Sequence, residues 1–205
     1  MTNEVTRIPA FMQQMAAIIT KSVLMLDQRQ TQVFFEAMLA AKSVYVAGAG
    51  RSGFIARAFG LRLMHLGYNT YVVGETITPA FLSSDTLVMF SGSGETHSMV
   101  SICGTAHEIG GNVCLITASP DSKMGRMADC VVNLGDITGY YHKDKNSFEI
   151  RQLTGNYRSV TSAFAPLGTL FETLALVFSD AVISALMEAK KAEIRDMQDR
   201  LTNVE

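Results

Sequence analysis

Apolar and polar positions follow two different patterns along this chain. In the first forty residues, apolar side chains recur at helical spacing over residues 8–19 and again over residues 33–39, with a polar break at residues 27–29. After residue 42, short apolar runs of strand length alternate with segments of helical period. The expected strands are residues 44–47, 70–73, 86–90, 113–117 and 130–133, and the expected helices between them are residues 52–66, 95–109 and 122–127.

This order of elements predicts an α/β fold. Continuous apolar strands that alternate with helices form a parallel sheet with helices on both faces and right-handed crossovers. We therefore expect a three-layer sandwich with a five-stranded parallel sheet. Residues 1–41 are expected to form a helical segment that packs on this domain, residues 42–187 the domain itself, and residues 188–205 a charged helix or tail.

Two segments in the second half of the chain depart from the strand and helix alternation. Residues 135–165 hold few aliphatic side chains and show no period, so an irregular loop is expected there. A long helix is expected after Pro166, because apolar side chains from Phe171 to Leu186 recur at i, i+3 and i+4 along one face.

Loops rich in glycine and serine follow two of the expected strands. They are residues 47–53, with the sequence AGAGRSG, and residues 91–96, with the sequence SGSGET. A junction from a strand to a helix directs free N–H groups and the positive end of a helix dipole at one point, where an anion binds. Two such loops on neighbouring strands predict a site for a phosphate group and the polar body attached to it. The expected contact residues are Gly50, Arg51, Ser52, Ser91, Gly92, Ser93, Gly94, Glu95 and Thr96.

The first loop could also be a dinucleotide fingerprint or a plain tight turn. Residues 48–53 fall one residue short of the spacing G-x-G-x-x-G, although Glu75 stands near the position of the acidic residue that such a fold uses. The second loop has no role in a dinucleotide fold. A second serine-rich loop at an equivalent strand end also favours a ligand site over two unrelated turns. Glu75, which follows the expected strand 70–73, is expected to line the same ligand site.

Composition limits the possible partners. The chain has 205 residues, 48% of them apolar, and a net charge of −2, so no basic surface for nucleic acid or an acidic membrane is expected. Apolar runs of transmembrane length and a signal-peptide pattern are not found. Three cysteines within apolar elements indicate buried reduced thiols and a cytoplasmic protein. The Cys and His spacing resembles no zinc site, and we expect neither a metal nor a cofactor.

Glu172 and His65 are the candidate proton-transfer residues, and each has a structural alternative. Residues 169–172 read T-x-x-E, a capping box in which Glu172 bonds back to the start of its helix; otherwise its carboxylate is a general base. His65 lies near the end of a helix, where it either complements the helix dipole or shuttles protons. Arg51 either contacts the ligand or is simply solvated. Glu95 either bonds sugar hydroxyls or interacts with the dipole of the helix that it begins.

Taken together, these motifs resemble the SIS (sugar isomerase) domain family and, within it, the 6-phospho-3-hexuloisomerases. The resemblance covers residues 42–187, and the order and spacing of its motifs are more specific than either loop alone. The residues that carry it are 48–53 (GAGRSG), 62–67 (RLMHLG), 73–76 (VGET) with Pro79, 91–96 (SGSGET), and 166–172 (PLGTLFE).

The resemblance implies a fold, an assembly and a reaction. The fold is a parallel sheet of the flavodoxin-like, nucleotide-binding type, and the assembly is a homodimer or homotetramer. The reaction is a metal-free shift of a sugar carbonyl that converts 3-hexulose 6-phosphate to fructose 6-phosphate, a step of formaldehyde assimilation by the ribulose monophosphate pathway. By the resemblance, the phosphate is bound by Ser52, Ser91, Ser93 and Thr96, and Glu172 is the base, with His65 as its partner from the same or a neighbouring subunit.

Two departures from the family pattern leave other functions open. Family members commonly carry a histidine motif before a final Asn-Leu-Glu, whereas this sequence ends in RLTNVE, and the loop over residues 135–165 is longer than usual. One alternative is an isomerase of this family for another sugar phosphate. The other is a sugar-phosphate sensor without catalysis, although no helix-turn-helix or basic segment accompanies the domain.

Overall fold

A single parallel sheet forms the centre of the molecule. The structure is a computed structural model that describes residues 5–135 and 169–203. The strands lie in the order β2-β1-β3-β4-β5, and every neighbouring pair is parallel. Their bounds are β1 Ser43–Gly48, β2 Asn69–Val72, β3 Thr86–Phe90, β4 Asn112–Thr117 and β5 Cys130–Asn133.

The register of the sheet places three loops side by side. Gly48 at the end of β1 pairs with Phe90 at the end of β3, and Phe90 pairs with Ile116 in β4. The order of the strands reverses at β1, which has β2 on one side and β3 on the other. Ligands of open α/β sheets bind beyond the carboxyl ends of the strands at such a reversal. The loops after β1, β3 and β4 therefore share the edge at which a ligand is expected.

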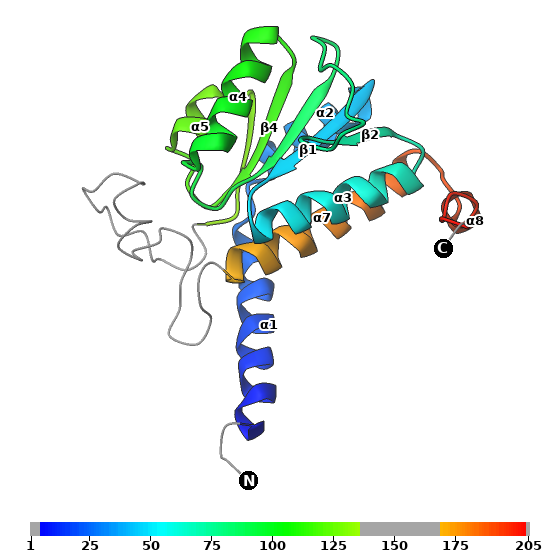
Figure 1. The fold of residues 1–205 in the computed structure, drawn as a ribbon. Coiled ribbons are helices and arrows are strands. Elements are labelled where there is room, and N and C mark those ends of the chain that lie inside the picture. Colours follow the sequence, from blue (N-terminus) through cyan, green and yellow to red (C-terminus); the bar gives the residue numbers. More distant parts are fainter. Residues whose placement is uncertain (1–4, 136–168, 204–205) are drawn as a thin grey trace.

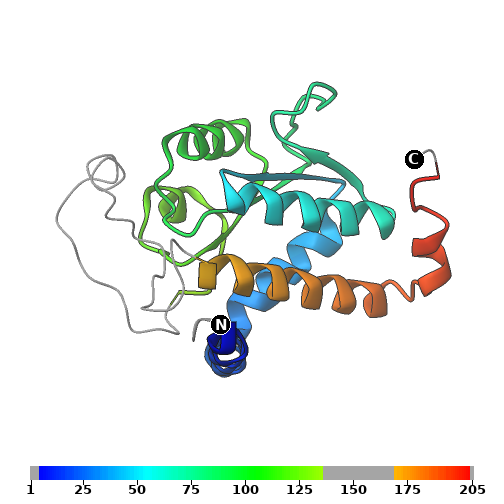
Figure 2. The ribbon, with the colours of Figure 1, turned by 60° about the horizontal axis from the view of Figure 1, so that its bottom comes forward.

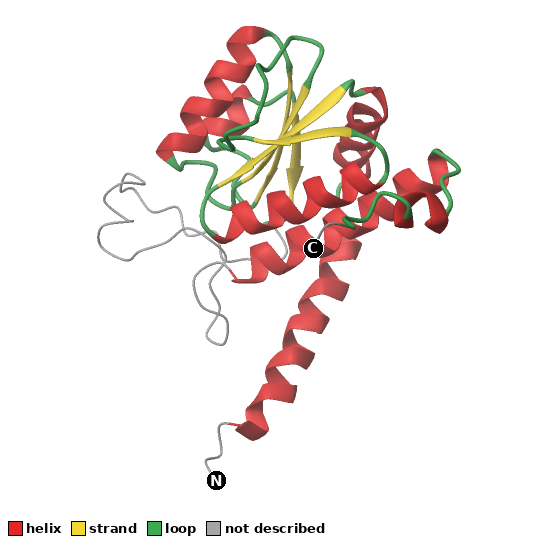
Figure 3. Ribbon diagram, turned by 45° about the vertical axis from the view of Figure 1, so that its right-hand side comes forward, coloured by secondary structure: helices red, strands yellow, loops and turns green. Residues whose placement is uncertain are grey.

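Helices cover both faces of the sheet (Figures 1 and 3). On one face lie α2 (Gln28–Ala40), α3 (Arg51–His65) and α7 (Thr169–Ala189), over a core that includes Phe34, Phe59 and Phe90. On the other lie α4 (His97–Ile109) and α5 (Lys123–Met127), over a second core that includes Met89 and Leu115. Strand residues thus alternate between two buried faces, which explains their continuous apolar runs.

The long helix α7 passes a length and hydropathy test for a membrane span. It has 21 residues and a window of mean hydropathy 1.8. However, 56% of that window is buried inside the molecule, as in the core helix of a globular domain. Its apolar character is therefore explained by the sheet and by α3, against which α7 packs.

Helix α1 (Ile8–Met25), which follows a short 3₁₀ turn η1 (Val5–Arg7), projects from the body of the molecule (Figures 1 and 3). Its C-terminal end adjoins α2 and α7, whereas its N-terminal end lies far from the sheet. Apolar side chains stay exposed along its length: Ile8, Met12, Val23 and Leu24. In the C-terminal half of α1, Met15, Ile18 and Ile19 pack against the same core to which α2 contributes Phe34 and Met38.

The predicted elements match the observed ones closely. All five strands agree within one or two residues, and α3, α4 and α5 begin within two residues of the expected positions. The expected loop over residues 135–165 lies, apart from its first residue, outside the described residues. In the described part of the charged tail, α7 ends at Ala189, and a short helix α8 (Ile194–Gln198) follows a turn in which Lys191 has a positive φ of 51°.

Candidate active site

The loop after β1 brings the start of α3 to the carboxyl edge of the sheet. Gly50 precedes the helix with φ 59° and ψ −133°, a conformation that side chains avoid, which explains the glycine. Its carbonyl accepts a hydrogen bond from the N–H of Gly53 at 3.0 Å. No side chain caps this end of α3. The N–H groups of Arg51 and Ser52, at the first two positions of the helix, thus remain for an anion, and Ser52 is buried there.

The loop after β3 orients its serine hydroxyls with backbone hydrogen bonds. Ser91 Oγ accepts the N–H of Gly94 at 3.1 Å, and Ser93 Oγ accepts the N–H of Glu95 at 3.3 Å. A hydroxyl that accepts such a bond keeps its own proton to donate. Thr96 precedes α4 without a side-chain cap bond, so this helix also begins with free N–H groups. Both predicted loops therefore present neutral donors at neighbouring strand ends.

A third loop, residues 118–122 after β4, was not predicted to take part and lies against the second. The N–H of Ala118 donates to Gly92 O at 3.1 Å, and a Cβ atom at Gly94, where φ is 62°, would meet Ser122 Oγ at 1.9 Å. Ser119 is 5% exposed, and its Oγ has no hydrogen-bond partner among the described residues. The signal was present in the sequence, because Ser119 and Ser122 follow an apolar strand as the serines of the other loops do.

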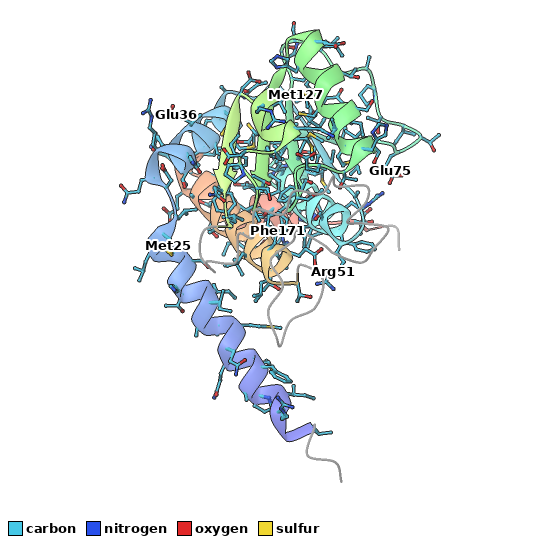
Figure 4. The ribbon with its side chains drawn as sticks, turned by 90° about the vertical axis from the view of Figure 1, so that its left-hand side faces the viewer. Met25, Glu36, Arg51, Glu75, Met127 and Phe171 are labelled. Atoms are coloured by element: carbon cyan, nitrogen blue, oxygen red, sulfur yellow. The ribbon has the colours of Figure 1, made fainter. Side chains whose placement is uncertain are left out.

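The first turn of α7 reaches both predicted loops. Arg51 Nε donates to Glu172 Oε2, and a Cβ atom at Gly92 would lie 3.0 Å from the ring of Phe171. Helices α3 and α7 run side by side with their starts at the same end, as Figures 1 and 2 show. Figure 4 shows Arg51 next to the beginning of α7. The Glu172 carboxylate, 9% exposed, thus lies at the junction of the loops, with a partner that a capping box does not require.

Two ion pairs lie at this edge of the sheet. Arg51 is bonded to Glu172, and Lys123 Nζ lies 3.5 Å from Glu95 Oε2. Glu95 Oε1 also accepts the N–H of Lys123 at 2.9 Å. The Glu95 carboxylate therefore joins the second loop to α5, which gives it a structural contact whether or not it binds a ligand. An anion here is met mainly by neutral N–H and O–H donors.

Two of the predicted site residues, His65 and Glu75, lie away from the loops at the carboxyl edge of the sheet. His65 ends α3, fourteen residues from Arg51 and therefore about 21 Å along the helix axis. It is 4% exposed, and Arg200 donates to its carbonyl oxygen at 3.2 Å. Burial and then the charge of Arg62 lower its pKa. Within one chain, His65 therefore cannot share a proton transfer with Glu172.

Glu75 also lies apart from the loops. It follows β2 in an exposed turn and forms an ion pair with Arg57, on the outer side of α3. Figure 4 shows Glu75 away from Arg51. Its carboxylate would join the site only if a ligand or another subunit extended that far.

Metal ligands are not clustered in the described part of the chain. No group of three or more His, Cys, Asp or Glu side chains there could hold an ion. The three cysteines are buried, and burial raises the pKa of the Cys103 thiol to about 11.

Fold and site together define a class: an α/β domain with neutral hydrogen-bond donors at the carboxyl ends of its parallel strands, next to a buried carboxylate. A profile of the SIS domain family matches residues 37–135. An uncharacterized protein of Archaeoglobus fulgidus is 42% identical over 160 residues, which are 78% of this chain and 79% of that protein. The 3-hexulose-6-phosphate isomerase of Bacillus subtilis is 36% identical over 168 residues, 82% of this chain and 83% of that enzyme.

A solved structure extends the comparison to the fold. It is a crystal structure of a hypothetical protein from Methanococcus jannaschii, from which a molecular function of 3-hexulose-6-phosphate isomerase was inferred for that protein. It is 28% identical, with a TM-score of 0.76, and the match covers 93% of this chain and 97% of the other. The chain belongs to the SIS-domain family of sugar isomerases, with relatives named 3-hexulose-6-phosphate isomerase.

Proposed function

We propose that this protein interconverts 3-hexulose 6-phosphate and fructose 6-phosphate with Glu172 as the base. The observation that carries this assignment is the position of the Glu172 carboxylate, buried at the point where two serine-rich loops meet the start of α7. The identities of 31–36% to enzymes named 3-hexulose-6-phosphate isomerase support the choice of substrate. The reaction would then serve the ribulose monophosphate pathway.

The chemistry requires one base and several hydrogen-bond donors. The base takes the proton from C2, the electron pair forms the C2–C3 double bond, and the C3 carbonyl oxygen takes a proton from water to become a hydroxyl of a cis-enediol; the proton that O2 gives up in the next step returns to water. The O2 hydroxyl then loses its proton as the C2 carbonyl forms, and the base returns the carbon-bound proton to C3. One carboxylate on one face of the C2–C3 bond can do both transfers, while donors stabilise the charge on the enediolate oxygens.

The two loops fit the phosphate end of such a substrate. Ser52 lies in the first turn of α3, Thr96 directly precedes α4, and Ser91 and Ser93 belong to the loop that leads to α4; neither helix start has a side-chain cap bond. This arrangement combines helix dipoles with neutral donors, which suits a dianionic phosphate in a protein of net charge −2. Ser119 adds a donor on the third loop, because its hydroxyl has no hydrogen-bond partner among the described residues.

The direct test is isomerase activity at pH 7, with 3-hexulose 6-phosphate made in situ by its synthase and fructose 6-phosphate followed by coupled enzymes. We expect turnover in the wild type and none in Glu172→Gln, with fructose 6-phosphate binding nearly unchanged by calorimetry. Wild-type turnover in Glu172→Gln would remove Glu172 from the mechanism. Binding without turnover in the wild type would favour another sugar phosphate, to be found with a substrate panel, or a sensor.

We also propose that the protein assembles through α1 and works in the cytoplasm. The exposed apolar side chains of α1 adjoin a groove of about 740 Å³ between the end of α1, the start of α2 and the middle of α7, lined by Phe35, Phe178 and Val182 among others. A second copy placed by a two-fold axis would cover both surfaces at once. Buried free cysteines support a reducing compartment.

A further inference from the structure

Arg51 occupies a position that helix electrostatics does not favour. It is the first residue of α3, where free N–H groups and the helix dipole stabilise negative charge. The first turn of α3 contains no acidic residue. The charge of Arg51 is instead matched from outside the helix, because its Nε donates to the Glu172 carboxylate on α7. Helix stability therefore does not explain an arginine here.

The two partners of this ion pair differ in their surroundings. The Glu172 side chain is 11% exposed, whereas that of Arg51 is 62% exposed. A glutamate at the edge of a site has several rotamers, and a planar guanidinium restricts them because its donors have a fixed direction. The contact joins residues that are 121 positions apart in sequence, so it depends on the parallel packing of α3 and α7.

We propose that Arg51 is the positioning residue for Glu172, a proposal that rests on the isomerase function proposed above. Its Nε–H holds Oε2 of the carboxylate, which leaves Oε1 to take the proton from the sugar. The exposed remainder of the guanidinium stays accessible to the ligand. Gly50 contributes indirectly, because its left-handed conformation sets the direction in which α3, and with it Arg51, leaves the sheet.

The competing role for Arg51 is simple binding of the substrate phosphate, and kinetics separates the two. Loss of a binding contact that is equal in the ground and transition states raises KM and leaves kcat unchanged. Loss of positioning lowers kcat, because misplacing a catalytic group by about 1 Å costs on the order of 100-fold in rate.

The experiment compares Arg51→Ala, Arg51→Lys and the matched control Arg57→Ala. Arg57 lies on the same helix, is similarly exposed and pairs with a glutamate, Glu75, that the structure places apart from Glu172. We expect kcat of Arg51→Ala to fall by about 100-fold with KM nearly unchanged. Added guanidinium chloride at tens of millimolar should restore turnover in a saturable manner, because it can occupy the vacated position. Arg51→Lys should stay well below the wild type, since an ammonium lacks the planar fork.

Three results would overturn the proposal. The first is a raised KM with wild-type kcat in Arg51→Ala, which would make Arg51 a binding residue. The second is a loss of kcat that guanidinium does not restore and that accompanies a lowered unfolding temperature, which would make the ion pair a structural contact. The third is an equal loss in Arg57→Ala. An inactive wild type would instead contradict the proposed function, so the two failures are distinguishable.

Discussion

The ring of Phe171 lies against Gly92, so closely that a Cβ atom at Gly92 would be 3.0 Å from Cδ1 and 3.3 Å from Cγ. Gly92 belongs to the loop after β3, and Phe171 immediately precedes Glu172. Because Phe171 is 1% exposed and held in the core, the ring has little room to move. The absence of a side chain at Gly92 thus lets the loop after β3 lie this close to the residue that precedes Glu172.

We predict that Gly92→Ala displaces the first turn of α7 and lowers kcat. Forcing a methyl group into a packed region costs typically about 1–3 kcal/mol of stability. Steady-state kinetics and thermal unfolding measure the two effects.

The control is Gly104→Ala in α4, where the nearest heavy atom to the new methyl group is Sδ of Met127 at 3.9 Å. That variant should keep its activity and gain up to about 1 kcal/mol from helix propensity. Wild-type kcat in Gly92→Ala would show that this contact does not position Glu172.

Loss of the Ser93 hydroxyl should weaken substrate binding. Its Oγ accepts a bond from Glu95 N–H, so its own proton is free for the phosphate. We expect Ser93→Ala to raise KM by an amount that corresponds to about 1–3 kcal/mol, with each 1.4 kcal/mol equal to about tenfold. The comparison variant is Ser101→Ala, on the exposed side of α4, which should behave as the wild type. An unchanged KM in Ser93→Ala would place the phosphate elsewhere.

Local sequence signals were sufficient for the fold and for two of the three loops. Residues 86–90 and 113–117 were recognisable as strands because both of their faces are buried, which removes polar residues from the run. The loops were recognisable because a strand-to-helix turn requires residues such as Gly50. These signals depend on neighbours in sequence, and each element carries its own.

The pairing of elements across the fold could not be predicted in the same way. The ion pair between Arg51 and Glu172 joins residues 121 positions apart, and no periodicity indicates it. The distance between His65 and Glu172 likewise depends on α3 and α7 running parallel, which places their starts together and leaves His65 at the far end. The resemblance to a family indicated candidate residues for the site. Tertiary packing determines which of these residues lie in contact.

We predict a contribution of His65 to the pH dependence of stability. Burial and Arg62 lower the pKa of its imidazole in the folded chain, while the unfolded value is about 6.5. Below that pH, the unfolded chain binds a proton that the folded chain resists, so the free energy of unfolding falls as the pH drops from 7 to 5.

Urea unfolding at pH 7 and at pH 5 measures this contribution. In His65→Gln the fall in unfolding free energy between the two pH values should be smaller than in the wild type, because the titrating group is gone. His107→Gln serves as the control, since His107 is exposed on α4 and should leave the wild-type dependence in place. Equal pH dependence in His65→Gln and the wild type would mean that the imidazole titrates alike in both states.

The exposed apolar side of α1 predicts a change of assembly on substitution. Leu24 is 84% exposed within one chain, so Leu24→Lys should cost the isolated fold little while placing a charge in the proposed interface. We expect light scattering to give a multiple of 22.3 kDa for the wild type and a smaller multiple for Leu24→Lys. The control is Leu201→Lys: Leu201 is 52% exposed and lies three residues after α8, a helix that Figure 1 shows apart from α1. A wild type that is monomeric at micromolar concentration, or a Leu24→Lys variant with wild-type mass, would show that α1 does not mediate assembly. Circular dichroism of each variant checks that a smaller mass reflects dissociation of folded chains.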